Sequence, residues 1–305
     1  MQPRDNLVLE FWDRSKELHI NNKEYRDFVN MFFSFLLKYD IKKRDLTSNS
    51  LIEKNKNISA AIVAKETGIL AGVEEFMFIN RDLKIRKFKN DGDRINKDEI
   101  LLKLSGNAVK ILERERTNLN LLQRMSGIAT LTYNMARIMK KTKIAATRKT
   151  LWGLLDKKAV SVGGGLTHRL NLNDGIIIKD NHLKILGDGI ERAINRVKTK
   201  SKYIEIEVEN KKQALTAASI LKNLSRKNKI KNMHAIMLDK IVPVEIKSII
   251  RELKENNFYE SILLEASGNI NGGNLAEYAD CGVDIISMGC ITNSARVLNI
   301  SQEIE

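Results

Sequence analysis

Cysteine, proline and aromatic residues are scarce in this chain, and each scarcity excludes a class of protein. Its 305 residues include 2 Cys, 2 Pro and 17 Gly, and aromatic residues make up 6%. So little proline and glycine beside 43% hydrophobic residues excludes fibrous and disordered chains. Cys281 and Cys290 are too few for a disulfide framework, which fits a reducing interior. The length suits one large domain or two ordinary ones.

Long apolar segments and targeting signals are also missing. The longest aromatic-rich run, residues 28–37, is interrupted by Asn30 and Ser34 and ends at Lys38. It is too short to span a bilayer and predicts a buried helix. The first residues, MQPRDNLVLEFWDR, hold no apolar stretch ahead of a cleavage site, so no secretory signal is expected. We therefore expect a cytoplasmic protein that has no membrane partner.

Positive charge is in excess, because 52 Lys and Arg residues face 38 Asp and Glu residues for a net charge of +14. Such an excess attracts anions in general. The lysine-rich runs at 84–89 and 222–231 are typical of a solvated surface. Zinc-finger cysteine spacing, an aromatic RNA-binding motif and a heptad-plus-basic region are all absent. Charge alone thus leaves nucleic-acid binding open, and we expect no nucleic-acid partner.

The first part of the chain mixes helical and strand-like patterns. Apolar residues recur at a helical period over residues 24–39, and residues 60–65 are typical of a strand. Residues 119–139 predict a long amphipathic helix. Gly127 inside this helix costs about 1 kcal/mol relative to Ala, which predicts a tight contact or a bend there.

From residue 143 onward, short strand-like runs alternate with helix-like stretches. This alternation predicts parallel βα units joined by right-handed crossovers. At least six units favour a closed α/β barrel, and a doubly wound open sheet is the alternative. The strand-like runs cover residues 144–147, 175–178, 203–208, 235–238, 262–264 and 284–287.

Charged or small polar residues follow every one of these runs. In an α/β barrel the chemistry takes place where the carboxyl ends of the strands converge. Arg148, Arg169 and Arg116 can make bidentate contacts to carboxylates or phosphates, whereas Lys149 and Lys179 supply point charges. Each residue alone has a structural explanation, but their coincidence at six strand ends predicts a pocket for a small, highly anionic substrate.

Two further groups of residues complete the predicted pocket. Ser267-Gly268 and Gly289 follow strands, where backbone N–H groups can bind a phosphate. Glu207 and Asp239 lie among many cations and could hold Mg²⁺ or stabilise a positively charged transition state.

Eleven collinear segments between residues 36 and 304 carry a resemblance to a known family. They are RDLTS (44–48), VAKETGILAG (63–72), DGDRI (91–95), ERTNLNLLQRMSGIATLT (115–132), TRKT (147–150), GGGLTHRLNL (163–172), IIIKDNH (176–182), EIEVEN (205–210), IMLDK (236–240), LEASGNI (264–270) and GVDIISMGCITNSA (282–295). Together they resemble quinolinate phosphoribosyltransferase, also called carboxylating nicotinate-nucleotide diphosphorylase.

The resemblance implies a two-domain α/β subunit. Residues 1–116 would form an N-terminal α/β sandwich domain, beginning with an extension of about 25 residues. Residues 117–293 would form a seven-stranded α/β barrel like that of type II phosphoribosyltransferases. The tail, residues 294–305, would pack on the sandwich. The family also implies a homodimer or a hexamer of dimers with shared active sites.

The implied reaction transfers phosphoribose from phosphoribosyl pyrophosphate to quinolinate with Mg²⁺. It releases pyrophosphate and CO₂ and yields nicotinate mononucleotide for NAD biosynthesis. The motifs assign the quinolinate carboxylates to Arg116 (from the partner subunit), Arg148, His168 and Arg169. They assign contacts with both substrates to Lys149 and Lys179, the ribose and metal to Glu207 and Asp239, and the phosphate loops to Ser267, Gly268 and Gly289.

The chain departs from the family pattern at several places, among them residues 39–43, which replace an acidic-glycine segment. The loop Leu151–Leu155 is shortened and lacks an arginine, and Asn269 replaces the second glycine of a phosphate loop. An enzyme acting on another aromatic acid is therefore an alternative. A related group associated with molybdate uptake is another, although it lacks the KDNH segment kept here as Lys179–His182. A noncatalytic nucleic-acid-binding protein is the alternative from a different class.

Overall fold

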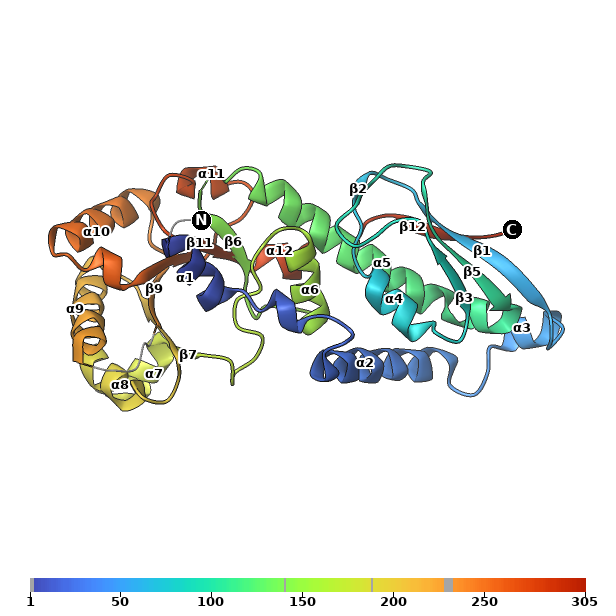
Figure 1. Ribbon diagram of the computed structural model, residues 1–305, viewed down its shortest axis with the longest axis horizontal. Coiled ribbons are helices and arrows are strands. Elements are labelled where there is room, and N and C mark those ends of the chain that lie inside the picture. The colour runs from blue at the N-terminus through green and yellow to red at the C-terminus, as the bar shows by residue number, and fades with distance from the viewer. Residues whose placement is uncertain (1–2, 140, 188, 228–232) are drawn as a thin grey trace. The chain divides into compact units, whose positions relative to one another are not determined.

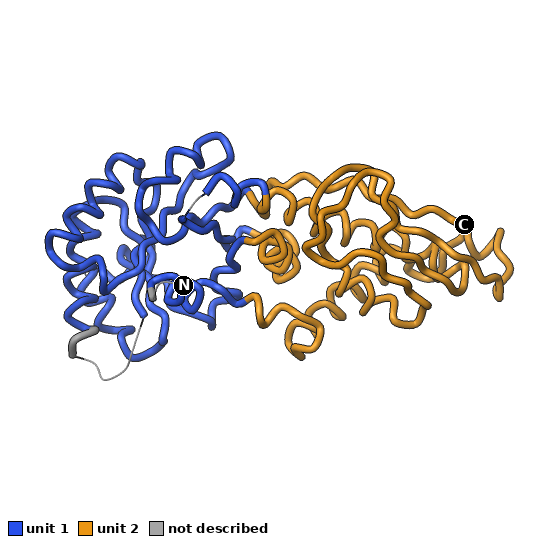
Figure 2. The backbone as a smooth tube through the Cα atoms, turned by 45° about the horizontal axis from the view of Figure 1, so that its top comes forward, with its two compact units in different colours: residues 1–14, 134–149, 165–290 blue, residues 15–133, 150–164, 291–305 orange. Residues whose placement is uncertain are grey.

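The computed structural model describes residues 3–139, 141–187, 189–227 and 233–305, which fold into two compact units. Figure 2 shows the two units in different colours. We call the first the barrel unit and the second the sandwich unit. The barrel unit comprises residues 1–14, 134–149 and 165–290, and the sandwich unit comprises residues 15–133, 150–164 and 291–305.

The barrel unit is built on a sheet of six parallel strands. Their order across the sheet is β6, β11, β10, β9, β8 and β7, and each neighbouring pair is parallel. On the free edge of β6, Leu166 forms an isolated parallel bridge with Ala145. The strands are β6 (Lys143–Ala146), β7 (Ile176–Ile178), β8 (Tyr203–Val208), β9 (Met233–Asp239), β10 (Leu263–Ser267) and β11 (Ile285–Met288).

All six strand-like runs identified in the sequence are confirmed as strands, and the α/β barrel class is confirmed. The family implied seven strands, and the described residues supply six together with the single bridge at Leu166. Helices cover the outer face of this sheet (Figure 1). The strands are therefore buried and rich in apolar residues. These helices are α7 (Asp180–Leu186), α8 (Ile190–Val197), α9 (Lys211–Lys227), α10 (Pro243–Glu255) and α11 (Leu275–Tyr278).

Helix α1 (Pro3–Trp12) belongs to the barrel unit, although the sequence suggested an extension of the N-terminal domain. Its apolar side chains Val8, Phe11 and Trp12 join a buried cluster with residues at or near the beginnings of barrel strands. The Nε of Arg4 donates to Asp284, just before β11, at 2.6 Å. The strand residues of the cluster are Ala145, Ala235, Leu263 and Ile285.

The sandwich unit contains a four-stranded antiparallel sheet in the order β12, β1, β5, β3. The C-terminal strand β12 pairs with β1, so the tail lies on the sandwich sheet. The strands are β1 (Asn57–Ala64), β3 (Lys84–Lys87), β5 (Ile100–Asn107) and β12 (Ile300–Ile304), and a second small sheet pairs β2 (Gly68–Ile69) with β4 (Arg94–Ile95). The helices of this unit include α2 (Lys23–Ile41), α3 (Leu46–Leu51), α4 (Val73–Ile79) and α6 (Leu154–Val162).

Helix α5 (Ala108–Ala136) runs from one unit into the other, so the expected division between residues 116 and 117 is corrected. Most of α5 packs within the sandwich unit because it contacts the C-terminal tail there. A Cβ on Gly127 would lie 2.1 Å from the backbone oxygen of Arg296, which confirms the predicted tight contact. Among the described residues, no helix is both long enough and apolar enough to cross a bilayer.

Candidate active site

One cavity of about 520 Å³ opens where the carboxyl ends of the barrel strands converge. This volume lies within the range of typical small-molecule sites. Five of its lining side chains are cations, and the other lining groups come from all six strands or the loops after them. The lining residues are Thr147, Arg148, Lys149, His168, Arg169, Ile177, Lys179, Glu207, Met237, Asp239, Lys240, Glu265, Ser267, Gly268, Asn269 and Ser287.

Lys179 and Glu207 form an ion pair across neighbouring strands. The Nζ of Lys179 lies 2.6 Å from Oε2 of Glu207. Lys179 stands directly before α7, and its backbone N–H donates to Nδ1 of His182 at 2.8 Å. The Lys179–His182 segment thus fixes the backbone from which the lysine reaches Glu207. On the next strand, the Nζ of Lys240 lies 3.2 Å from Oδ2 of Asp239.

Gly268 allows the loop after β10 to pass closely beside Asp239 and Lys240. Its φ of +90° lies in the region that favours glycine. A Cβ there would lie 2.6 Å from Cγ of Lys240 and 2.7 Å from Oδ1 of Asp239. The loop is held by the N–H of Lys240, which donates to the carbonyl of Ser267 at 2.8 Å. Asn269 also has a positive φ, of 56°.

His168 lies in the cavity wall with both ring nitrogens engaged by the protein. Its Nδ1 accepts the backbone N–H of Arg169 at 2.8 Å. Its Nε2 lies 3.0 Å from Oε2 of Glu265 and 3.5 Å from Oε2 of Glu205. Because Nδ1 acts as an acceptor, this arrangement assigns the ring proton to Nε2. The ring therefore orients the loop and faces the buried acids.

Glu205 and Glu265 are buried side by side behind His168. The exposed fractions of Glu205 and Glu265 are 1% and 0%, so the two acids sit in a poorly solvated interior. Burial, reinforced by the nearby charge of Glu265, raises the pKa of Glu205 well above its ordinary value. Burial beside Glu265 therefore favours the protonated form of Glu205. Glu205 and Glu207 alternate along β8 and both are buried, so they face inward and do not form a solvated face.

Arg148 and Arg169 line the same cavity, and the charge of Arg148 acts on Arg169. Burial, together with the charge of Arg148, lowers the pKa of Arg169. Two guanidinium groups in such proximity repel each other, and an anion between them relieves that repulsion. Their planar donors suit a carboxylate. This end of the cavity can therefore bind an organic acid.

Nine of the eleven candidate residues found by sequence analysis line this cavity. Gly289 follows β11 but is not among the lining residues. Arg116 lies on α5 in the sandwich unit, where its side chain is exposed. Sequence reasoning did not select Glu265 as a site residue. The available signal was its position directly after a strand-like apolar run, where the other site residues also lie. Sequence reasoning also did not select the apolar lining residues Ile177 and Met237, which nothing distinguishes from core residues.

The chain matches two domains of one protein family. Residues 45–126 match the N-terminal domain of quinolinate phosphoribosyl transferase, and residues 128–303 match its C-terminal domain. The chain belongs to this family. The family resemblance inferred from the sequence motifs is thereby confirmed.

Several members of this family are similar to the chain over most of its length. A probable carboxylating nicotinate-nucleotide pyrophosphorylase of Methanothermobacter thermautotrophicus is 39% identical over 280 residues, covering 88% of this chain and 96% of the relative. Its Bacillus subtilis counterpart is 35% identical over 296 residues, covering 93% and 95%. The nicotinate-nucleotide pyrophosphorylase structure from Ehrlichia chaffeensis is 36% identical, with a TM-score of 0.78 and coverage of 90% and 98%.

Proposed function

We propose that the chain transfers the phosphoribosyl group of phosphoribosyl pyrophosphate to quinolinate, with loss of CO₂, to give nicotinate mononucleotide. The observation that carries this proposal is the single cavity that combines Arg148, Lys149, Arg169 and Lys179 with three carboxylates on its wall. Two anionic reactants repel each other in water, and a cation-lined cavity offsets that repulsion. Family membership supports the same reaction.

The side chains divide into two regions in the proposed reaction. Arg148 and Arg169 bind the carboxylates of the pyridine acid, and Lys149 adds a further positive charge. The loop Ser267–Asn269, assisted by Gly289, offers backbone N–H groups to the ribose phosphate. The acid and the ribosyl donor are thereby held together for reaction.

The carboxylates of Glu207 and Asp239 face the ribosyl region. Departure of pyrophosphate leaves positive charge on the ribose, and a fixed carboxylate stabilises that charge. Lys179, paired with Glu207 at 2.6 Å, is placed to contact both reactants. After the ring nitrogen is alkylated, its positive charge together with Arg148 and Arg169 stabilises the electrons left by CO₂.

The donor chemistry of Glu207 and Asp239 also fits Mg²⁺. Magnesium prefers hard oxygen ligands and usually completes its coordination with water and substrate phosphates, so two carboxylates suffice. These two residues would hold the ion, which when bound would neutralise charge on the pyrophosphate group. The three-ligand cluster among the described residues, His168 with Glu205 and Glu265, is a separate buried group.

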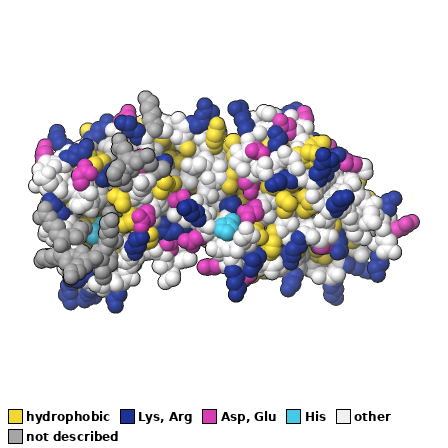
Figure 3. Space-filling view, in the orientation of Figure 1, with side chains coloured by type: hydrophobic (Ala, Val, Ile, Leu, Met, Phe, Trp, Pro, Cys, Tyr) yellow, Lys and Arg dark blue, Asp and Glu magenta, His cyan; other side chains and the backbone are white. Residues whose placement is uncertain are grey.

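The altered loop Leu151–Leu155 does not line the barrel cavity. Trp152 instead packs against Phe32, with ring centroids 5.3 Å apart, inside the sandwich unit. On the visible face in Figure 3, Lys and Arg side chains are dispersed among acids and do not form one continuous patch. Neither observation favours another acid or nucleic acid over quinolinate.

A turnover assay tests the proposal directly. The full chain is incubated with phosphoribosyl pyrophosphate and Mg²⁺ together with either quinolinate or nicotinate, and mononucleotide and CO₂ are measured. We expect product with quinolinate and none with nicotinate. Lack of turnover of quinolinate, or preference for nicotinate, would contradict the proposal.

Variants of two lysines at opposite ends of α7 supply the control. Lys179→Ala removes the cavity cation, and we expect kcat/KM to fall roughly 100-fold with folding intact. Lys184→Ala changes an exposed lysine that pairs with Asp180 on α7, and wild-type activity is expected. Equal activities would show that cavity charge does not drive the reaction.

A further inference from the structure

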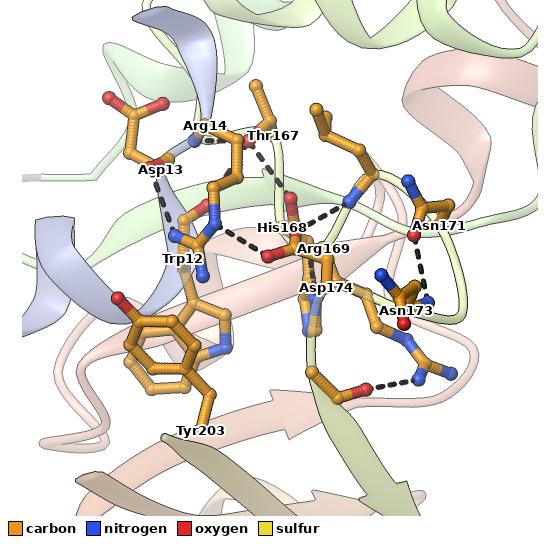
Figure 4. A network of polar contacts seen from close by, with 12 residues as sticks. Trp12, Asp13, Arg14, Thr167, His168, Arg169, Asn171, Asn173, Asp174 and Tyr203 are labelled. Carbon is orange, nitrogen blue, oxygen red and sulfur yellow. Dashed lines mark hydrogen bonds and ion pairs between the residues drawn. The ribbon is translucent and has the colours of Figure 1, made fainter. Parts of the chain in front are cut away.

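The last residue of α1 and the segment that follows it are bonded directly to the loop that carries His168 and Arg169. We call residues 167–174 the His168 loop. The carbonyl of Trp12 accepts the backbone N–H of His168 at 2.7 Å. The backbone N–H of Arg14 donates to Oγ1 of Thr167 at 2.8 Å (Figure 4). One backbone–backbone bond and one backbone–side-chain bond therefore join the N-terminal segment to a loop more than 150 positions away.

The Arg14 side chain extends this link to the far end of the loop. Its Nε donates to Oδ1 of Asp174 at 2.8 Å, and the other carboxylate oxygen of Asp174 accepts the N–H of Leu170 at 2.9 Å. The guanidinium also lies 4.5 Å above the ring of Tyr203 on β8. Arg14 is only 9% exposed, so this is a packed bridge with little solvent screening. One arginine thus ties the loop to the barrel wall.

The His168 loop requires such support because its backbone is strained. His168 has a φ of 54°, a conformation that is uncommon for residues other than glycine and persists where the surroundings enforce it. The bonds from Trp12 and Glu265 enforce it from two sides. The next residue is Arg169, whose Nη1 donates to the carbonyl of Gly175 at 2.7 Å. The direction of the Arg169 guanidinium therefore depends on how the loop is held.

We infer that residues 12–14 are a positioning element for Arg169 and thereby set affinity for the pyridine dicarboxylate. Arg14 itself does not line the large cavity and acts through the loop. This inference rests on the proposed function, in which Arg169 binds the acid. It assigns to the N-terminal segment a role in selecting the acid substrate, with no role toward the ribosyl donor, whose proposed phosphate and ribose groups lie on or directly after β8 to β11.

The experiment compares two arginines that both anchor the N-terminal segment. Arg14→Ala removes the bridge to Asp174, whereas Arg4→Ala removes an ion pair of similar burial with Asp284 and leaves the loop contacts in place. For Arg14→Ala we expect KM for quinolinate to rise roughly tenfold while KM for phosphoribosyl pyrophosphate stays within about twofold. For Arg4→Ala we expect a lower unfolding temperature and wild-type values of both constants.

A second measurement is independent of turnover. Hydrogen exchange of the amides in the His168 loop is expected to accelerate in Arg14→Ala and to stay unchanged in Arg4→Ala. If Arg14→Ala does not fold, Asp174→Asn removes the charge from the same bridge and is expected to give the same selective rise in KM.

Two results would overturn the inference. The first is that, in Arg14→Ala, the KM values for quinolinate and for phosphoribosyl pyrophosphate rise in parallel or do not change at all. The second is that the amides of the His168 loop exchange at the same rate in Arg14→Ala and in Arg4→Ala. If the wild-type chain does not turn over quinolinate, the proposed function is wrong, whatever the result for the positioning role of residues 12–14. The exchange comparison still decides whether residues 12–14 position the loop.

Discussion

In the cavity, the contacts of a side chain with its neighbours determine what it can bind as much as its charge does. His168 is predicted by its motif to hold a substrate carboxylate, yet its ring nitrogens are bonded to Arg169 and the buried acids. In this arrangement the ring accepts the backbone N–H of the neighbouring arginine, and its binding of a substrate carboxylate stays a prediction. Glu265, which sequence reasoning did not select, supplies the other half of that arrangement because it is completely buried.

Gly268 provides a prediction at the scale of one residue. Gly268→Ala would place a methyl group 2.6 Å from Lys240 and 2.7 Å from Asp239, forcing the loop away from the ribosyl region. We expect KM for phosphoribosyl pyrophosphate to rise roughly tenfold, because the loop N–H groups would move by an ångström or more.

Gly164→Ala is the matched control for this variant. Gly164 has a φ of +87°, close to the +90° of Gly268, but a Cβ there would meet nothing within 4 Å. Both variants therefore place a side chain at a similar positive φ, which costs about 1–2 kcal/mol, and only one disturbs the cavity. Steady-state kinetics of the two variants separate strain from steric displacement. Indistinguishable KM values would refute the role assigned to the loop.

At the scale of elements, helices α2 and α4 of the sandwich unit are joined by a buried polar contact. The hydroxyl of Tyr25 on α2 donates to Oε1 of Glu75 on α4 at 2.6 Å. Burial, followed by the charge of Asp91, raises the pKa of Glu75 from 4.5 to about 7. Lys158 lies on the same side and partly opposes this shift. The helix pair is therefore most stable when Glu75 is protonated.

The burial of Glu75 makes the stability of the sandwich unit depend on pH. Because the folded-state pKa of Glu75 is raised, its contribution is complete below about pH 4.5 and is lost as the pH rises through about 7. Relative to Glu75→Gln, the wild-type free energy of unfolding should fall by roughly 3 kcal/mol between pH 4.5 and 8. Urea denaturation of both proteins at several pH values measures the difference. A difference that does not change with pH would disprove the assignment.

At the scale of the whole molecule, Arg116 poses the question of assembly. Its exposed side chain on α5 belongs to the sandwich unit, whereas the other candidate residues lie in the barrel unit. We propose that Arg116 enters the active site of a second subunit in a homodimer. An arginine supplied by a partner would complete the cation set that binds the two carboxylates.

Mixed assemblies of two inactive variants test this proposal. Arg116→Ala and Lys149→Ala are each expected to lose most activity, but random mixing produces dimers in which one site has both residues. Activity should then recover to about a quarter of the wild-type value, as closed two-fold symmetry requires. Size-exclusion chromatography checks that both variants still assemble. No recovery in assembled mixtures would place Arg116 in its own subunit's site or outside any site.

Much of the barrel and of its cavity could be predicted from the sequence because the governing pattern is local. A run of apolar residues becomes a buried parallel strand, and the topology of βα units brings all the carboxyl ends to one side. For this reason Arg148, Lys179 and Asp239, which lie far apart in the chain, could be grouped correctly. The specific family motifs then restricted the chemistry.

The tertiary structure alone decided what depends on contacts between distant segments. His168 contacts Glu205 and Glu265, which lie on two different strands. Arg14 is attached in the same way to a loop that lies far from it in the sequence. The same is true of the division into units, because α1 packs with strands that come more than 100 residues later. The local periodicity of the sequence does not predict contacts between such distant residues. They are selected by shape and by the need to satisfy buried polar groups once the chain has folded.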